Sequence, residues 1–152
     1  MGVPGAGVIP LADVNVLLAL LWPKHEGHKA AHVWFAQTGD TGWATNPLTQ
    51  LGVLRLLTNP ALTRSALSVG AALSLVTQAC QHPRHVFWPL ESGLLRGLGA
   101  RATRMQGYRQ WTDAALLAQA EERGGVVVTF DAGMRELAGD RASELVLVLK
   151  AK

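Results

Sequence analysis

A chain of 152 residues with 49% hydrophobic and 16% charged side chains is long enough to bury one core and is not of the composition typical of disordered proteins. Its net charge of +3, with ten arginines and four lysines, permits an anionic partner without requiring one. The single cysteine, Cys80, excludes an intramolecular disulfide and a thiolate zinc cluster. With neither a secretory leader nor a membrane-spanning segment evident, we expect a cytoplasmic protein without membrane contact.

The predicted elements alternate between short apolar strands and helices. In chain order, strands are expected at residues 8–11, 42–45, 85–90, 126–130 and 145–149, and helices at 16–21, 28–37, 47–58, 65–80 and 112–123. Asn46 is a good N-cap for the third helix, and Pro47 suits its first position. Nearly apolar strands that alternate with helices indicate a parallel sheet covered on both faces. We therefore expect an α/β fold in a single domain, residues 1–152.

Three aspartates lie where predicted strands end or helices begin. Asp13 interrupts the most apolar stretch of the chain, "VIPLADVNVLLALLWP", where a buried carboxylate without a partner is costly. Asp131 follows a later strand, and Asp113 opens a helix behind Thr112. In an open parallel sheet these ends converge on one crevice. Three acids gathered there repel one another unless a cation joins them, and oxygen ligands select Mg²⁺ or Mn²⁺. Such a cation polarises phosphodiesters.

Each aspartate also has a simpler interpretation. Asp13 and Asp131 are suitable helix caps, and Asp113 complements a helix dipole. Taken singly, capping is the better explanation for each of them. The three together favour a metal site. Capping alone would not require an aspartate within the apolar sequence around Asp13, where a weaker cap would suffice.

The segments "LADVNVLLALLW", "HKAAHVWF", "GWATNPLTQLGVLRLLTNP" and "TDAALLAQAEERGGVVVTFDAGM" occur in an order that resembles the PIN-domain ribonucleases, in particular the VapC toxins of bacterial toxin–antitoxin pairs. The resemblance implies a PIN-like α/β/α sandwich around a parallel sheet of four or five strands. It implies a Mg²⁺- or Mn²⁺-dependent endoribonuclease acting on structured RNA such as tRNA or rRNA. It also implies a homodimer that is inhibited by a VapB-type antitoxin.

The resemblance also assigns a site by position. Its metal ligands are Asp13, Asp113 and Asp131, with Asn15 ordering the site and Thr45 or Asn46 adding a polar group at the rim. Family members often hold a glutamate where this chain has Gln50. Glutamine has the same reach but no charge, so divalent-ion binding should weaken and a second metal becomes less expected. Our hypothesis is one cation, with Gln50 positioning water or metal.

Two other function classes compete with a nuclease. A PIN fold that binds RNA or its antitoxin without cleaving, or cleaves only weakly, is kept open by Gln50. A nucleotide-binding or phosphatase-like enzyme is disfavoured, because no P-loop or GxGxxG follows a predicted strand and "DVN" lacks a second aspartate.

Three histidines, His25, His28 and His32, lie close together in "HEGHKAAH". Two of them have the i,i+4 spacing of helical zinc ligands. The HExxH arrangement is missing, so packing and surface roles are favoured.

A basic stretch covers residues 96–109 and lacks acidic residues. It contains Arg96, Arg101, Arg104 and Arg109, with Tyr108 and Trp111 as stacking surfaces. RNA recognition uses such arginine–phosphate contacts and aromatic stacking, so the stretch is a candidate substrate contact; an ordinary solvated loop is the alternative.

The apolar helix surfaces "LGVLRLL" and "ALSVGAALSLV" exceed what a small sheet needs for cover. A dimer contact or a groove for an antitoxin helix is expected there.

Overall fold

The computed structural model describes residues 7–64, 67–90 and 93–151. Its five strands form one parallel sheet in the order β3-β2-β1-β4-β5. The strands are β1 (Pro10–Ala12), β2 (Trp43–Thr45), β3 (His85–Phe87), β4 (Val126–Thr129) and β5 (Val146–Val148). The chain moves from β1 to β2 and β3 on one side and returns to β4 and β5 on the other. The order therefore reverses beside β1, and a crevice opens where such a reversal occurs, at the carboxyl ends of the strands.

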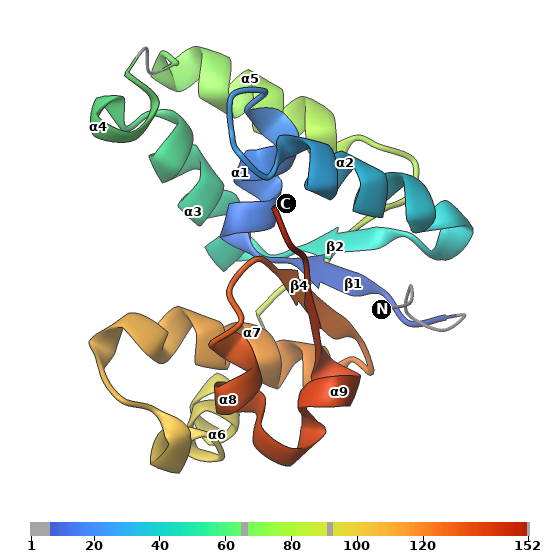
Figure 1. The fold of residues 1–152 in the computed structure, drawn as a ribbon, viewed down its shortest axis with the longest axis vertical. Coiled ribbons are helices and arrows are strands. Elements are labelled where there is room, and N and C mark those ends of the chain that lie inside the picture. Colours follow the sequence, from blue (N-terminus) through green and yellow to red (C-terminus); the bar gives the residue numbers. More distant parts are fainter. Residues whose placement is uncertain (1–6, 65–66, 91–92, 152) are drawn as a thin grey trace.

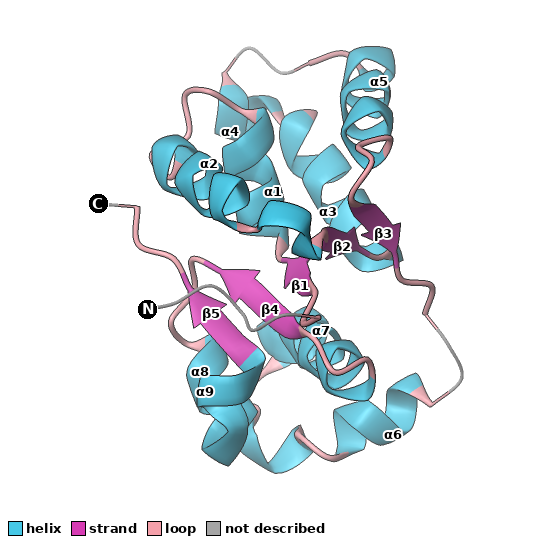
Figure 2. Ribbon diagram, turned by 90° about the vertical axis from the view of Figure 1, so that its right-hand side faces the viewer, coloured by secondary structure: helices cyan, strands magenta, loops and turns pink. Residues whose placement is uncertain are grey.

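Helices cover both faces of the sheet, which confirms the predicted α/β/α fold (Figure 2). One face carries α1 (Val14–Leu21), α2 (His28–Gln37), α3 (Pro47–Leu57), α4 (Pro60–Thr63) and α5 (Val69–Cys80). The other carries α6 (Leu94–Gly99), α7 (Trp111–Glu122), α8 (Met134–Ala138) and α9 (Ala142–Leu145). The short 3-10 turns are η1 (Gly39–Thr41), η2 (Ala102–Arg104), η3 (Tyr108–Gln110) and η4 (Gly139–Arg141).

Two hydrophobic cores result, one on each face. Leu11 and Val127, which are neighbours across β1 and β4, face the core under α7, α8 and α9. The next pair along the strands, Ala12 and Val128, faces the core under α1, α2, α3 and α5. Side chains of a strand alternate between faces, so strands buried on both sides must be apolar throughout, as these are.

The start of α3 has the predicted cap. Asn46 accepts a hydrogen bond from the backbone of Thr49, whose hydroxyl accepts one from the backbone of Asn46, and Pro47 takes the first helical position. This reciprocal capping satisfies two backbone donors that the first turn leaves without partners. Asn46 also donates to Gln119 of α7 at 2.7 Å, across the sheet edge.

The observed elements differ from the predicted ones mainly at their ends. Helix α7 begins one residue before Thr112, with Gln110 as its N-cap, so the predicted cap at Thr112 is wrong. Helix α5 begins at Val69, and its predicted start at Ser65 lies outside the described residues. The helices α6, α8 and α9 were not predicted; each has six residues or fewer, too short to show a hydrophobic period. No helix within the described ranges has the length and apolar character to cross a membrane.

Candidate active site

Asp13 lies at the carboxyl end of β1, where it caps α1. Its backbone N–H donates to the carbonyl of Val128, which holds the residue beside β4. One carboxylate oxygen accepts from the N–H of Val14 at 2.7 Å, and the other accepts from the hydroxyl of Thr129 at 2.7 Å. The side chain is buried, and burial raises its pKa against these two stabilising bonds. Asp13 is therefore a helix cap and also a buried charge at the sheet edge.

Thr129, the last residue of β4, organises the acids, although sequence reasoning missed it. Its hydroxyl donates to Asp13 and accepts from the backbone N–H of Asp131 at 3.0 Å and from the Asn15 amide at 3.3 Å. One donor and two lone pairs are all that a hydroxyl offers, so its bonding capacity is used completely. The only sequence signal was a hydroxyl residue two positions before an aspartate in an otherwise apolar strand.

Asn15 and Asp131 are held in the same network. The Asn15 side-chain oxygen accepts from the backbone N–H of Phe130 at 3.2 Å, which directs its amide group toward Thr129. One Asp131 oxygen accepts from the N–H of Gly133 at 2.8 Å, and the side chain is exposed. The structure thus brings Asn15 and Asp131 to Asp13 through one hydroxyl.

Asp113, in the first turn of α7, completes the group of acids. Partial burial raises its pKa to about 7, and the charges of Asp13 and Asp131 contribute to the rise. Asp131 likewise raises the pKa of Asp13, after the larger effect of burial. The three carboxylates therefore lie within electrostatic reach of one another, as the ends of parallel strands predict.

The donor set suits a hard divalent cation, because carboxylate oxygens that repel one another are stabilised by a positive charge between them. Across residues 7–64, 67–90 and 93–151, however, no three His, Cys, Asp or Glu side chains are arranged as a group that could hold a metal ion. A cation here would thus need the carboxylates to turn toward it or water to complete its shell. Mg²⁺ commonly binds through one or two carboxylates and keeps several waters.

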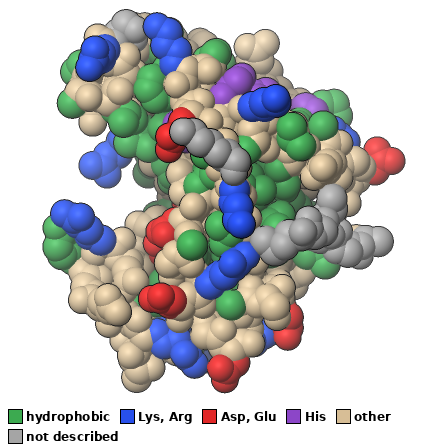
Figure 3. Space-filling model, viewed as in Figure 1, with side chains coloured by type: hydrophobic (Ala, Val, Ile, Leu, Met, Phe, Trp, Pro, Cys, Tyr) green, Lys and Arg blue, Asp and Glu red, His purple; other side chains and the backbone are tan. Residues whose placement is uncertain are grey.

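The crevice is visible from outside as a notch between the two helical layers (Figure 3). The strands end on this side, with α3 and α4 above and the turns that precede α7 below (Figure 1). Lys and Arg side chains stand on both lips of the notch. Cations around an acidic crevice attract a polyanion that the acids alone would repel.

Gln50, in α3, contacts a second polar cluster. Its amide donates to the hydroxyl of Thr45 at 3.0 Å and to the sulfur of Cys80 at 3.7 Å. Thr45 in turn lies 2.7 Å from a ring nitrogen of His85, whose pKa is lowered by burial. Among the described residues no contact between Gln50 and an acid is recorded, so its role in positioning water or metal stays a prediction.

Thr45 and Asn46 are buried to 1% and 0% exposure. Neither side chain is open to solvent, and the prediction that one of them adds a polar group at the rim of the site stays a prediction. Both side chains are used for internal bonds, Thr45 in the Gln50 cluster and Asn46 in the α3 cap and the bond to Gln119.

Two of the three histidines, His28 and His32, have the favoured packing role. Ring nitrogens of His28 and His32 bond the carbonyls of Ala19 and Leu20, at 2.7 and 3.0 Å. These bonds fasten α2 to the last turn of α1, where helix carbonyls lack partners.

The basic stretch divides into two parts. Arg101 is buried and pairs with Glu121 of α7 at 3.4 Å, so the prediction that it contacts substrate is wrong. Arg109 is exposed beside the ring of Tyr108, 5.6 Å from its centroid, and Trp111 is 53% exposed. This second part keeps its candidate role in substrate contact.

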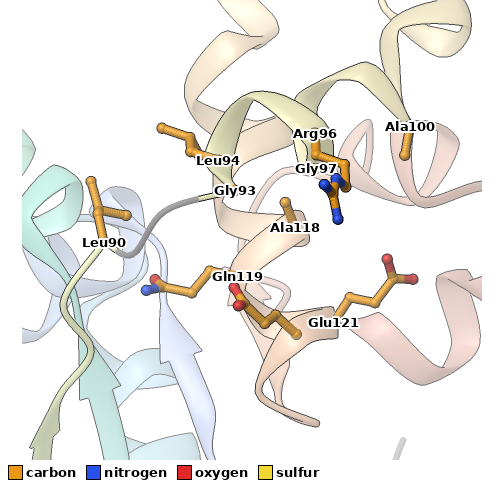
Figure 4. A pocket seen from close by; sticks show the side chains of 10 residues that line it. Leu90, Gly93, Leu94, Arg96, Gly97, Ala100, Ala118, Gln119 and Glu121 are labelled. Carbon is orange, nitrogen blue, oxygen red and sulfur yellow. The ribbon is translucent and has the colours of Figure 1, made fainter.

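A separate pocket of about 350 Å³ lies between α6 and α7 (Figure 4). Leu94, Arg96, Ala118 and Glu121 are among its lining residues. None of the predicted site residues lines it, so this pocket is distinct from the crevice of the acids.

Comparison with known proteins agrees with this arrangement. The PIN domain family matches residues 11–140. Ribonuclease VapC39 of Mycobacterium tuberculosis is 37% identical over 128 residues, which are 84% of this chain and 92% of that protein. Ribonuclease VapC38 of the same organism is 38% identical over 139 residues, 91% of this chain and 96% of the relative. Ribonuclease VapC29 is 39% identical over 132 residues, 87% and 92% of the two chains. With its five-stranded parallel sheet and its acids at the carboxyl edge, the chain belongs to the PIN-domain family and to the VapC ribonucleases within it.

Proposed function

We propose that the protein is a Mg²⁺- or Mn²⁺-dependent endoribonuclease and the toxin of a VapBC-type pair. The observation that carries the proposal is the convergence of Asp13, Asp113 and Asp131 on one crevice, where their negative charges repel one another. The ribonuclease names of its relatives support the same reaction class.

In this proposal the three aspartates would hold the cation. When bound, the cation would supply charge neutralisation at the phosphodiester and an activated water. The remaining work belongs to the chain. Thr129 holds one oxygen of Asp13 and the backbone of Asp131 in place, and Asn15 fixes the position of Thr129. Such fixed donors and acceptors lower the cost of bringing the reacting groups together.

The substrate would be structured RNA such as tRNA or rRNA. The basic lips of the notch and the exposed Arg109, Tyr108 and Trp111 support an RNA backbone with accessible bases. A VapB-type antitoxin as inhibitor and a homodimer are proposed from the family. Exposed apolar side chains on α5, Val69 at 77% and Leu73 at 55%, offer surface for such contacts.

The test is RNA cleavage with and without divalent ions. Purified wild type should cleave total tRNA or rRNA in Mg²⁺ or Mn²⁺, lose the activity in EDTA, and regain it when the ion is restored. Asp13→Asn should abolish cleavage, whereas Asp40→Asn, an exposed residue of η1, should not. Cleavage that survives both EDTA and Asp13→Asn would contradict the proposal.

One observation favours a second candidate, an RNA- or antitoxin-binding PIN module with weak or no catalysis. The position at which the family often has a glutamate is occupied by Gln50, and its amide is bonded to Thr45 and Cys80. RNA binding without turnover, even in Mn²⁺, would establish this candidate.

A further inference from the structure

A second groove opens beside the acids, and most of the residues that line it have no part in the acid network. It has a volume of about 790 Å³ and is lined on one side by Asn15 and Phe130, which belong to or adjoin the network around Asp131. The chain after β5 forms part of the opposite side. In Figure 1 this last segment runs past β4 toward the connection between α1 and α2. The groove therefore adjoins the acid network through Asn15 and Phe130.

One wall of the groove is aromatic. The rings of His25 and Phe130 lie 6.0 Å apart at 31°, and the edge of Trp22 meets His25 at 6.1 Å. The connection between α1 and α2 packs closely on Phe130: a Cβ at Gly27 would lie only 2.6 Å from the far end of that ring. Both groove-facing rings are half-buried. A fixed, partly exposed aromatic surface suits the stacking of an unpaired base.

The neutral ring of His25 adds a hydrogen-bond donor to this wall. Its Nδ1 accepts from the backbone N–H of Gly27 at 2.9 Å, so in the neutral ring the proton is on Nε2. Burial lowers the pKa of His25, which favours the neutral ring near pH 7. The neutral imidazole therefore presents an uncharged face for stacking and a donor at its edge.

The opposite side of the groove carries positive charge. Lys150, in the segment after β5, lies on this side, and Arg135 and one acid, Glu26, also line the groove. Lys150 is exposed, and no ion pair is recorded for it within the described part of the chain. A cationic side facing an aromatic wall has the chemistry of a nucleotide, with a phosphate on one side and a base on the other.

We propose that this groove binds one unpaired nucleotide of the RNA next to the scissile phosphate, with the base on Phe130 and His25 and a phosphate at Lys150. The inference rests on the proposed function, which places RNA at the adjoining acids. It narrows the substrate to a site with an unstacked base, such as a loop, because both faces of a base within a duplex are already covered by its neighbours.

The experiment measures binding of a fluorescent single-stranded RNA, and of the same sequence as a blunt duplex, to the Asp13→Asn protein, which should not cleave. Phe130→Leu keeps apolar volume but removes the ring, and Lys150→Ala changes an exposed residue. Matched controls are Phe87→Leu on β3 and Lys29→Ala on α2, both exposed and outside the groove. We expect about a tenfold loss of single-strand affinity for Phe130→Leu and a smaller loss for Lys150→Ala, with no loss for the controls. Duplex binding should not change.

A second arm locates the base. A single abasic position next to the cleaved bond should weaken binding to the Asp13→Asn protein about as much as Phe130→Leu does, and the two changes together should cost no more than either alone. Additive losses would overturn the subsite, as would single-strand affinity that is unchanged in both groove variants. Variants that lose an antitoxin peptide but keep RNA would overturn it in favour of a protein partner. Wild type that cleaves normally in those cases keeps the proposed function, whereas wild type that cleaves no RNA in Mg²⁺ or Mn²⁺ contradicts that function itself.

Discussion

Two polar clusters lie beside different strands of the same sheet and differ in their electrostatics. The acid cluster at the ends of β1 and β4 contains Asp13 and Asp131, with Asp113 beside them in α7. Burial raises the pKa of Asp13 and of Asp113, and the charges of neighbouring acids add to both increases. The neutral cluster, Thr45, Gln50, Cys80 and His85, lies at β2 and β3 and is joined by hydrogen bonds among uncharged groups. Of these two clusters, the first would gain stability from a cation, because its members repel one another. A polar cluster is thus a candidate metal site when its like charges repel one another, and polarity alone is not enough.

Among the substitutions that test this difference between the clusters, Thr129→Val is expected to have the largest effect on cleavage and stability. The change removes the donor to Asp13 and the acceptor for Asp131 and Asn15, so buried groups lose their partners. We expect cleavage to fall at least about 100-fold and the free energy of unfolding to fall by about 2 kcal/mol. Urea unfolding and cleavage rates measure the two effects. Thr129→Ser should restore most of both, and Thr58→Val, whose hydroxyl bonds only helix carbonyls, should leave cleavage intact.

Gln50→Glu tests whether the two clusters are separate. A carboxylate cannot donate to Thr45, so one hydrogen bond of the neutral cluster is lost and a charge enters it. We expect the free energy of unfolding to fall by about 1 kcal/mol and the pKa of His85 to rise, as measured by NMR titration.

The Mg²⁺ affinity of the same variant decides the role of Gln50. Affinity equal to that of wild type would place Gln50 outside the coordination shell, as its bonds to Thr45 and Cys80 favour. A clear increase would mean that the side chain reaches the cation and that the two clusters form one site.

Asp113→Asn tests, through the pH dependence of stability, what burial and the neighbouring acids cost the charged form of Asp113. The pKa of Asp113 is about 7 in the folded chain, above the ordinary aspartate value of 3.8, so the folded state holds the proton more tightly. Without metal, the contribution of this group to stability is therefore lost as pH rises from about 4 to 7. Asp113→Asn should remove this loss, so in EDTA the variant should gain stability relative to wild type between pH 5 and pH 8.

Urea unfolding at the two pH values measures this relative gain. Asp140→Asn, an exposed aspartate of η4, is the matched control and should show no pH-dependent gain. The same difference between Asp113→Asn and wild type at both pH values would show that neither burial nor the neighbouring acids raise the pKa of Asp113 in the folded protein.

The smallest effect is expected at the basic stretch. Arg109→Ala should weaken RNA binding and reduce the slope of log affinity against log salt by about 0.7, the value for one phosphate contact to a single strand. Arg101→Ala should instead destabilise the fold, because it leaves Glu121 without this buried partner. An unchanged salt slope for Arg109→Ala would remove this residue from the substrate path.

The sequence predicted the acids better than their surroundings. Asp13, Asp113 and Asp131 could be placed together because strand ends and helix starts converge in any parallel α/β sheet. Thr129 was missed because threonine is common in strands for its shape alone, and two of its three hydroxyl partners, Asp13 and Asn15, are more than 100 positions away. Arg101 was misassigned for a similar reason, since its burial depends on Glu121 in another helix. Contacts of this kind need the tertiary fold.

The most direct test of the central claim is the binding of Mn²⁺ or Mg²⁺ by calorimetry to wild type, Asp13→Asn, Asp113→Asn and Asp131→Asn. If the three carboxylates serve one cation, wild type should bind about one ion, and each substitution should weaken binding at least about tenfold. Wild-type affinity in any two of these variants would contradict the shared site.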